Sequence, residues 1–370
     1  MAKILLMAPG HDSRDRRVNR TLEAIESVGH EYRIVYESKY RLPADTDHVW
    51  TTKDYMSKER FLKEFRMNFH FDYVWIHDSG LFGLELVRRI NRWFKDADVI
   101  FDYHDWIEWE VYYQIKKRGI LPTTFSRLLY WIAVKMLHTR YRNSRITYLI
   151  GISKKQIKTL ERNLSLSVCE TVIVSNTRMR LPEQPSEFIG NLNDGILWIG
   201  NVMRGRDLEK LASFMRHYNR DTNRKALVLY IIGRILSKDL YESLSSLIKV
   251  EYLGEFNDDY DIAKKIDGKN VIGFYYGWID SFNTGINSIA SPNKVYSMLN
   301  LQVPLILGSE LRNMFNLFTE LESIQYIQNE QDFAESVDFF KHKQILISNK
   351  GFEWEDKMKE RLENLLHLLK

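Results

Sequence analysis

Short apolar runs alternate with longer amphipathic segments along this chain of 370 residues. Short runs rich in Val, Ile, Leu and Tyr are typical of strands buried on both faces, whereas apolar residues spaced by three and four predict helices. In the first half, the runs predict strands at Ile4 to Ala8, Tyr32 to Tyr36, Tyr73 to His77, Val99 to Tyr103, Tyr148 to Ile152 and Thr171 to Val174. Helices are predicted between them, including 16–28, 80–95 and 154–163.

The same alternation starts again after residues 177–195, which contain two prolines and little periodicity and therefore predict a linker. The second series predicts strands at Ile196 to Ile199, Leu227 to Ile232, Val250 to Leu253, Val271 to Tyr275, Val303 to Leu307 and Ile324 to Ile327. Strands that alternate with helices form parallel sheets. The predicted class is α/β, with two Rossmann-like doubly wound parallel-sheet domains that face a cleft. We expect domains at 1–180 and 195–350, and an amphipathic closing helix at 351–370 that packs on the first domain.

Composition narrows the class of protein. The chain is 44% hydrophobic and 28% charged, as expected of a soluble globular protein, and no apolar run is long enough to predict a membrane-spanning helix. The N-terminal residues MAKILLMAPGHDSRDRR predict a buried first strand and not a signal peptide. A single cysteine, Cys169, excludes an internal disulfide framework and a cysteine-based metal site. The expected compartment is the cytoplasm.

The charge is unevenly distributed, although the net value is only +4. Residues 111–160 contain eleven Lys and Arg and no Asp or Glu. Within them, residues 125–142 interleave basic and large apolar side chains, a pattern that suits a helix at an anionic membrane surface. The candidate membrane face contains Arg127, Trp131, Lys135, Arg140 and Arg142. A core helix with a solvated basic face explains the pattern equally well, and nucleic acid is an alternative anionic partner that we do not favour.

The most informative segment is residues 291–309, SPNKVYSMLNLQVPLILGS. Ser291 predicts an N-cap and Pro292 the first helical residue, ahead of a helix from Val295 to Leu301, so that Lys294 lies in the first turn. A cation there opposes the helix dipole at a cost of about 0.3–1 kcal/mol. An anion at the same end would be stabilised by free backbone N–H groups, the dipole and the ammonium together. Ser291, Asn293 and Lys294 therefore predict half of a phosphate site, against the alternative of a well-capped surface lysine.

Glycines end three predicted strands of the second half. Gly200 follows the first strand and precedes Arg204 and Arg206, and the sequence matches neither G-x-G-x-x-G nor the Walker A motif. The next strands end at Gly233, followed by Arg234, and at Gly254. Because ligands of open α/β sheets bind at the carboxyl ends of strands, we expect these residues to form one phosphate-binding site with Lys294. Taken singly, each glycine is more often only a turn residue.

Several segments together resemble the nucleotide-sugar glycosyltransferases of the GT-B fold, particularly the bacterial group that builds capsule, exopolysaccharide and lipopolysaccharide. In the second half, the resemblance rests on LWIGNVMRGRDLEKL, LYIIG, VEYLGEF and SPNKVYSMLNLQVPLI, and on the closing helix FEWEDKMKERLENLL. In the first half, it rests on DRRVNRTLEAIESVGHEYRIVY and FDYHDWIE. The resemblance implies an acceptor-binding first domain, a donor-binding second domain, a nucleotide-sugar donor and no metal or other cofactor.

One position departs from the family pattern. By resemblance, the position of Ser297 usually carries a glutamate that binds the donor ribose, and serine offers no carboxylate for two hydroxyl groups. Lys294, Arg204 and Arg206 still suit the diphosphate leaving group. Asp259 and Asp261 match a D-x-D metal signature, but their place at a predicted helix start favours capping.

For catalysis we predict His104 and Asp105, which follow a strand and are flanked by Trp106 and Trp109. A histidine or carboxylate at this place suits removal of the acceptor proton. Polar residues also follow other strands and predict the rim of a cleft on the acceptor side, namely Gly10, His11, Asp12, His77, Asp78 and Trp106. For each of these, a structural hydrogen bond is the alternative.

The sequence thus predicts a metal-independent glycosyltransferase that moves a sugar from a nucleotide diphosphate to a lipid-linked or glycan acceptor at the inner membrane face. Two alternatives are a catalytically degenerate binding subunit that supports a partner glycosyltransferase and a sugar-nucleotide epimerase. Ser297 is the residue that favours the degenerate subunit.

Overall fold

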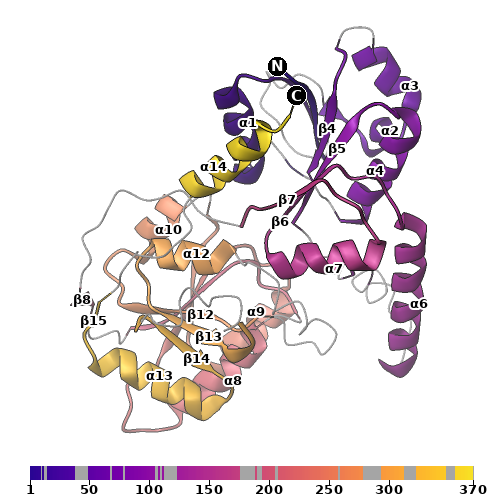
Figure 1. The fold of residues 1–370 in the computed structure, drawn as a ribbon. Coiled ribbons are helices and arrows are strands. Elements are labelled where there is room, and N and C mark those ends of the chain that lie inside the picture. The colour runs from indigo at the N-terminus through magenta and orange to yellow at the C-terminus, as the bar shows by residue number, and fades with distance from the viewer. Residues whose placement is uncertain are drawn as a thin grey trace. The chain divides into compact units, whose positions relative to one another are not determined.

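The computed structural model describes residues 1–9, 11, 15–37, 49–66, 69–77, 80–104, 107–108, 111, 123–175, 188–189, 194–204, 207–256, 259–277, 293–311, 322–346 and 355–369. The chain forms two compact units (Figure 1). The first consists of Met1–Ser175 together with Glu355–Lys370, and the second of Asn176–Trp354.

The first unit is built on a seven-stranded parallel sheet with the strand order β3-β2-β1-β4-β5-β6-β7. Its strands are β1 (Lys3–Ala8), β2 (Glu31–Glu37), β3 (Val49–Trp50), β4 (Tyr73–His77), β5 (Asp98–Tyr103), β6 (Tyr148–Gly151) and β7 (Glu170–Ile173). The chain runs outward from β1 to β3 and then continues from β4 on the other side of β1. The carboxyl ends of β1 and β4 therefore flank the point where the strand order reverses, the usual ligand position in such sheets.

Helices pack against this sheet. They are α1 (Arg16–Val28), α2 (Thr52–Tyr55), α3 (Lys58–Phe61), α4 (Leu81–Trp93), α6 (Thr123–Tyr141), α7 (Lys154–Leu164) and α14 (Glu355–Leu366), with a short π-helix at Leu62–Arg66. Helix α1 begins at the N-cap Asp15, whose carboxylate accepts the N–H groups of Arg17 and Val18, and ends at Gly29 in the left-handed conformation.

Helix α14, from the end of the chain, packs against α1 in the first unit (Figure 1). Met358 and Leu362 of α14 are buried in the same cluster as Ala24 and Ile25 of α1. The hydroxyl of Ser27 also donates to Glu363 at 2.5 Å. The chain thus returns to its first unit after completing the second.

The second unit contains a six-stranded parallel sheet with the order β11-β10-β9-β12-β13-β14. Its strands are β9 (Gly195–Ile199), β10 (Val228–Ile232), β11 (Val250–Gly254), β12 (Val271–Tyr275), β13 (Leu305–Gly308) and β14 (Ile324–Ile327). The helices are α8 (Leu208–Asn219), α9 (Lys238–Leu247), α10 (Asp259–Ile266), α12 (Asn293–Asn300) and α13 (Glu330–His342), with a 3-10 turn at Ser309–Leu311. A separate antiparallel pair joins β8 (Phe188–Ile189) to β15 (Ile345–Leu346).

The predicted α/β class with two parallel-sheet domains is confirmed. The short strands β3, β8 and β15 were not predicted, because two residues are too few for a periodic pattern to appear. Among the helices that the structure describes, none has the length and hydropathy that crossing a membrane requires.

Candidate functional site

Three histidines meet at the carboxyl edge of the first sheet. His11 follows β1, His77 ends β4 and His104 follows β5, and these strands are neighbours in the sheet. The ring centroids of His11 and His104 lie 5.1 Å apart, those of His11 and His77 5.8 Å, and those of His77 and His104 6.3 Å. The structure therefore brings together three histidines that lie far apart in the sequence, each at its predicted strand end.

A buried ion pair between Arg17 and Asp102 lies next to this histidine cluster. Asp102 of β5 is 1% exposed, and Nε of Arg17 lies 3.1 Å from each of its carboxylate oxygens. Arg17 also donates to the backbone carbonyl of Val174 at 2.9 Å. Burial alone would raise the pKa of the Asp102 carboxyl. The charge of Arg17 and the contacts with His77 and His104 lower this pKa by more than burial raises it, so that it lies well below its ordinary value. Asp102 is therefore ionised at neutral pH.

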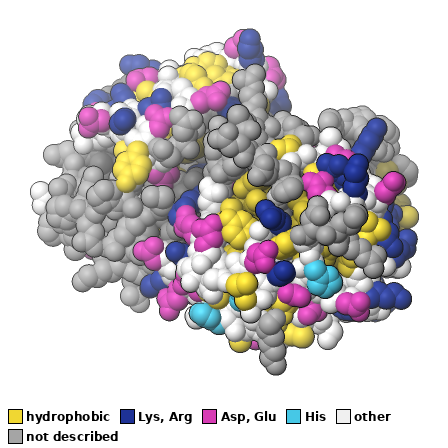
Figure 2. Space-filling model, turned by 90° about the horizontal axis from the view of Figure 1, so that it is seen from above, with side chains coloured by type: hydrophobic (Ala, Val, Ile, Leu, Met, Phe, Trp, Pro, Cys, Tyr) yellow, Lys and Arg dark blue, Asp and Glu magenta, His cyan; other side chains and the backbone are white. Residues whose placement is uncertain are grey.

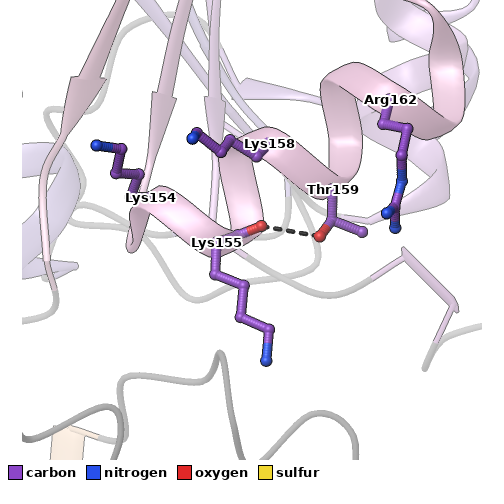
Figure 3. Close-up of a pocket in the computed structure, with 5 residues that line it drawn as sticks. All are labelled: Lys154, Lys155, Lys158, Thr159 and Arg162. Carbon is purple, nitrogen blue, oxygen red and sulfur yellow. Dashed lines mark hydrogen bonds between the residues drawn. The ribbon is translucent and has the colours of Figure 1, made fainter.

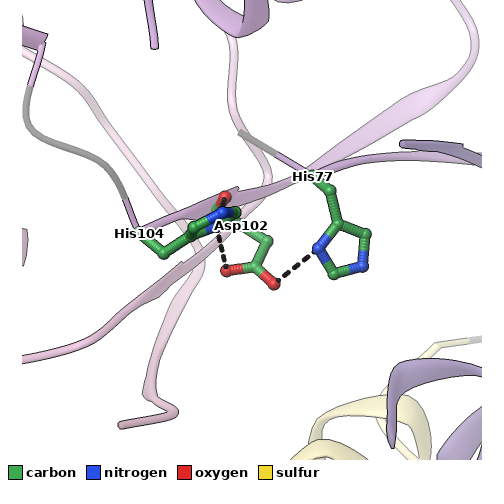
Figure 4. Close-up of side chains that lie close together, drawn as sticks. All are labelled: His77, Asp102 and His104. Carbon is green, nitrogen blue, oxygen red and sulfur yellow. Dashed lines mark hydrogen bonds and ion pairs between the residues drawn. The ribbon is translucent and has the colours of Figure 1, made fainter. Parts of the chain in front are cut away.

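The two neighbouring imidazoles point toward Asp102 (Figure 4). Nδ1 of His77 lies 3.1 Å from Oδ2 of Asp102, and burial lowers the pKa of His77 to about 4, although the charge of Asp102 acts in the opposite direction. His77 is therefore neutral near pH 7. Nδ1 of His104 lies 3.2 Å from the backbone carbonyl of Asp102 and 3.7 Å from Oδ1.

The contacts of His104 fix the roles of its two ring nitrogens. A carbonyl oxygen only accepts hydrogen bonds, so Nδ1 of His104 donates, and Nε2 is the nitrogen that carries the lone pair in the neutral form of the ring. Such a nitrogen can take a proton from a hydroxyl group. The side chain of His104 is 10% exposed, so it is reachable from solvent, in contrast to His77.

His11 is held in a similar way, because its Nδ1 donates to Asp15, the N-cap of α1, at 2.7 Å. Burial raises the pKa of Asp15, but the hydrogen bond and the electrostatic attraction of His11 lower it to well below its ordinary value. Each of the three imidazoles thus has a carboxylate of α1 or β5 within reach.

The ligand atoms of His77, Asp102 and His104 lie within 4.8 Å of one another, close enough to be considered as a metal site. However, both oxygens of Asp102 already face the guanidinium group of Arg17. A divalent cation at the same carboxylate would be repelled by that fixed charge. The donor set therefore fits a network of hydrogen bonds and ion pairs better than a metal centre.

In the second unit, Lys294 lies in the first turn of α12, as predicted, but it does not extend into solvent. Its side chain is 11% exposed, and Nζ lies 4.5 Å from the ring centroid of Trp198 and 4.6 Å from that of Tyr275. Two aromatic faces stabilise a partly desolvated ammonium. A Cβ atom on Gly200 would lie 3.6 Å from the same Nζ, so the ammonium lies beside the end of β9. The alternative of a surface lysine is excluded.

Asp207, at the start of α8, contacts several of the residues around Lys294. Its carboxylate accepts from Nε1 of Trp198 at 3.1 Å and from the backbone N–H of Tyr276 at 3.0 Å. Oδ1 also lies 4.0 Å from Nζ of Lys294. The buried carboxylate therefore orients one of the two aromatic rings and balances part of the ammonium charge.

The three strand-end glycines are in contact through their backbones. The N–H of Gly200 donates to Ile232 at 2.8 Å, and that of Gly233 donates to Gly254 at 2.9 Å. Gly200 and Gly233 have φ angles of 132° and 141°, and a Cβ atom on Gly233 would lie 2.0 Å from the carbonyl oxygen of Gly200. Only glycine permits this close approach. The three glycines thus follow one another along the sheet edge, and Gly200 is the one that lies beside Lys294.

The two described arginines of the predicted phosphate site have acidic partners. Nη2 of Arg204 lies 2.5 Å from Asp239, and Nη1 lies 3.3 Å from Glu209. Nε of Arg234 lies 3.1 Å from Glu255. Both arginines are exposed, so a phosphate group could reach them only by competing with these carboxylates.

Other predicted residues are placed as follows. Ser297 is fully buried in α12, and its hydroxyl has no hydrogen-bond partner among the described residues. Asp259 and Asp261 occupy the first turn of α10, where Asp259 accepts from Asn300 at 3.1 Å. The side chain of Asn293, although its backbone starts α12, lies outside the described residues. Also outside them are Gly10, Asp12, Asp78, Asp105, Trp106, Trp109, Arg206, Ser291 and Pro292.

Helix α6 has a buried face and an exposed apolar face. Val134, Leu137 and Tyr141 pack into the core of the first unit. The opposite face exposes large apolar side chains, namely Leu128, Trp131, Ile132 and Met136. Trp131 is 68% exposed and Met136 67%.

The basic residues predicted for this helix differ in their contacts. Arg140 pairs with Glu85 at 2.9 Å and Nε of Arg142 lies 3.3 Å from the hydroxyl of Ser165, whereas the side chain of Arg127 is outside the described residues. Lys135 is exposed. On the face drawn in Figure 2, described Lys and Arg side chains stand among Asp and Glu side chains. Of the basic side chains predicted for the membrane face, Arg140 is thus already paired with a carboxylate.

Arg17, Asp102 and Asp207 were not predicted as site residues. For Arg17 a signal was available, because it lies on the same helical face as the buried Thr21 and Ala24. For Asp102 the signal was an acid that directly follows the apolar run Val99 to Phe101 within a strand. Nothing in the local sequence of Asp207 reveals its buried contacts.

No protein-family model matches the chain, and no curated protein sequence matches it. Solved structures do match. One is the UDP-GlcNAc 2-epimerase of Methanocaldococcus jannaschii in complex with UDP-GlcNAc and UDP, with a TM-score of 0.52, 13% identity and 99% of both chains covered. A second is an α-glucosyltransferase in complex with UDP and a 13-mer DNA, with a TM-score of 0.54, 10% identity, and 99% of this chain and 95% of the other covered.

A third match is the lipopolysaccharide outer core galactosyltransferase WaaB, with a TM-score of 0.51, 11% identity, and 98% of this chain and 95% of the other covered. These likenesses show the fold, which GT-B glycosyltransferases and UDP-GlcNAc 2-epimerases share.

Proposed function

We propose that this chain is a metal-independent glycosyltransferase that moves a sugar from a nucleotide diphosphate donor to a lipid-linked or polysaccharide acceptor in surface glycan synthesis. The observation that carries the proposal is the position of Lys294. Its ammonium is held by Trp198 and Tyr275 at the carboxyl edge of the second sheet, beside Gly200. An ammonium in the first turn of a helix, next to the backbone at a strand end, suits a diphosphate.

The proposed reaction forms a bond between an acceptor oxygen and the anomeric carbon of the sugar and breaks the bond from that carbon to the diphosphate. Lys294 and the N-terminus of α12 would stabilise the negative charge that grows on the leaving diphosphate. Nε2 of His104 would take the proton of the acceptor hydroxyl, with inversion at the anomeric carbon. Lys294 supplies the positive charge that a metal ion provides in other transferases.

The structural neighbours support a nucleotide-sugar ligand, because the epimerase and the glucosyltransferase are both in complex with UDP. They also keep an epimerase as the second candidate, since several of the matching structures are of UDP-GlcNAc 2-epimerases. An epimerase needs no acceptor, whereas a transferase does. A degenerate subunit that supports a partner glycosyltransferase is the third candidate, and the buried Ser297 is the feature in its favour.

The test of this function is the release of nucleoside diphosphate from a panel of UDP-, GDP- and dTDP-sugars, with and without acceptor. We expect slow release in water, faster release with acceptor, and no inhibition by EDTA. Lys294→Ala should weaken binding of the matching nucleoside diphosphate by about 1.5–3 kcal/mol in calorimetry, the scale of a charge-assisted hydrogen bond. Lys238→Ala, at the exposed first turn of α9, is the matched control.

Three other results would each argue against a transferase. Conversion of a UDP-sugar to its epimer without acceptor would identify the epimerase. Nucleotide binding without turnover on any donor and acceptor would favour the degenerate subunit. Equal affinities of Lys294→Ala and the intact chain would remove the observation on which the proposal rests.

We further propose that the protein acts at the cytoplasmic face of the inner membrane. The exposed apolar face of α6, with Trp131 at its centre and Lys135 beside it, suits insertion among lipid headgroups. Each Lys or Arg near an anionic surface contributes about 1 kcal/mol. Co-sedimentation with vesicles that contain phosphatidylglycerol, and release by high salt, are therefore expected.

The double variant Trp131→Ser/Lys135→Glu should bind these vesicles at least about tenfold more weakly, because it loses the apolar anchor and reverses one charge. Leu247→Ser/Lys249→Glu, which changes an exposed apolar and basic pair in the second unit, is the control. Equal sedimentation of both variants, or of the intact chain with neutral vesicles, would contradict membrane binding through α6.

A further inference from the structure

Helix α7 presents a row of basic side chains that the proposed function has not used. Lys154, Lys155, Lys158 and Arg162, together with Thr159, line a pocket of about 500 Å³ (Figure 3). All four basic residues are exposed, and they leave the same helix over its whole length. A volume of this size is in the range of small-molecule sites.

The charges on this helix oppose its own stability. Lys154 and Lys155 occupy the first turn, where the helix dipole disfavours cations and which contains no acidic residue of its own. Lys154, Lys158 and Arg162 follow one another at intervals of four residues, so like charges are neighbours on the helix surface. Within the described part of the chain, no carboxylate pairs with the charged groups of Lys154, Lys158 or Arg162. An anion bound in the pocket would relieve all of these repulsions.

The opposite face of α7 fixes the helix on the sheet. Ile157 and Leu160 are buried, and the side chain of the buried Gln156 accepts the backbone N–H of Ile152 at 2.9 Å. A Cβ atom on Gly151 would lie 2.6 Å from Ile157, so the helix starts in close contact with the end of β6. The basic side chains therefore project from a rigid element.

The start of α7 lies at the same sheet edge as the histidine cluster. Gly151, the last residue of β6, pairs with Tyr103 of β5, and His104 directly follows Tyr103. The N-cap Ser153, whose hydroxyl accepts the N–H of Gln156, follows two residues after Gly151. A ligand whose anionic group lies on α7 is thus placed along the edge that carries the proposed base.

We propose that the pocket on α7 binds the diphosphate group of the acceptor. This inference rests on the proposed function and adds the substrate class, since it makes the acceptor a diphosphate-linked glycan. Four cations around one pocket suit a compact group with two or three negative charges. Arg162 can bind phosphate oxygens in a bidentate manner and the lysines act as point charges.

The experiment uses the full chain with inorganic pyrophosphate as the probe, titrated by calorimetry at low salt. Lys294→Ala is present in every titrated protein, so that the proposed donor site is weakened to the same extent in all of them. Adding Lys154→Gln/Lys158→Gln should weaken pyrophosphate binding at least about tenfold, because two charge-assisted contacts are lost. Adding Lys53→Gln/Lys58→Gln, which removes two exposed lysines of the same unit, should change it less than about twofold.

If the α7 pair and the control pair weaken pyrophosphate binding equally, the effect is one of net charge and the proposal is overturned. Unchanged pyrophosphate affinity in the α7 pair would also overturn it. A loss of binding to phosphatidylglycerol vesicles in the α7 pair, with pyrophosphate affinity unchanged, would assign the pocket to lipid headgroups and would also overturn it. With Lys294 intact, the α7 pair should bind nucleoside diphosphate as tightly as the unchanged chain. That measurement reports on the proposed function separately from the α7 site.

Discussion

His104→Gln is expected to lower the turnover number of sugar transfer about 10²–10⁴-fold, the usual contribution of a general base. Nδ1 of His104 donates to the carbonyl of Asp102, which leaves Nε2 as the proton acceptor, and glutamine has no group of comparable basicity. The affinity for nucleoside diphosphate should stay the same, since Lys294 belongs to the other unit. Steady-state kinetics with donor and acceptor, together with calorimetry of the donor product, measure both quantities.

His217→Gln is the matched control, because His217 is an exposed histidine of α8 whose ring lies 3.4 Å from Glu330. It should leave the turnover number within about twofold, as expected for a surface substitution. A turnover number of His104→Gln close to that of the unchanged chain would show that another group removes the proton, or that the reaction retains configuration.

Arg17→Met is expected to lower the free energy of unfolding by about 3–5 kcal/mol, because it leaves the buried carboxylate of Asp102 without its cation. Denaturation by urea, followed by circular dichroism, provides the measurement. Since the pKa of Asp102 is lower in the folded than in the unfolded chain, the pair stabilises the fold at neutral pH. This contribution should decrease as the pH falls below the ordinary pKa of a carboxyl group, about 4.

The adjacent arginine supplies the control. Arg16 pairs with Glu23 at 2.6 Å on the surface, where an ion pair contributes at most about 1 kcal/mol, so Arg16→Met should have a small effect. Replacing both partners, as in Arg17→Met/Asp102→Leu, should restore part of the lost stability, because no unpaired charge stays buried. A loss below about 1 kcal/mol in Arg17→Met would mean that solvent or another cation reaches Asp102.

The predicted strands and helices of the sequence correspond closely to the structure, because their signals are local. Strand β4 covers the predicted run Tyr73 to His77, and α1 covers the predicted segment 16–28. Capping and dipole effects act within one turn, so the place of Lys294 in the first turn of α12 was also predictable. Strand β13 starts at Leu305 and not at Val303, because a proline at 304 precedes it and has no N–H to donate.

The sequence by itself therefore determined the elements, the parallel sheets and the positions of His11, His77, His104 and the strand-end glycines at the ends of strands. Only the tertiary structure decided which of these residues meet. Arg17 and Asp102 are 85 residues apart, and the side chain of Lys294 in α12 turns inward because it packs on the ring faces of Trp198 in β9 and Tyr275 in β12. Arg204 likewise pairs with Asp239, which is distant in the sequence and is brought near by the fold. Such contacts depend on strand order and on the direction of long side chains, and neither property is encoded in the few residues around each position.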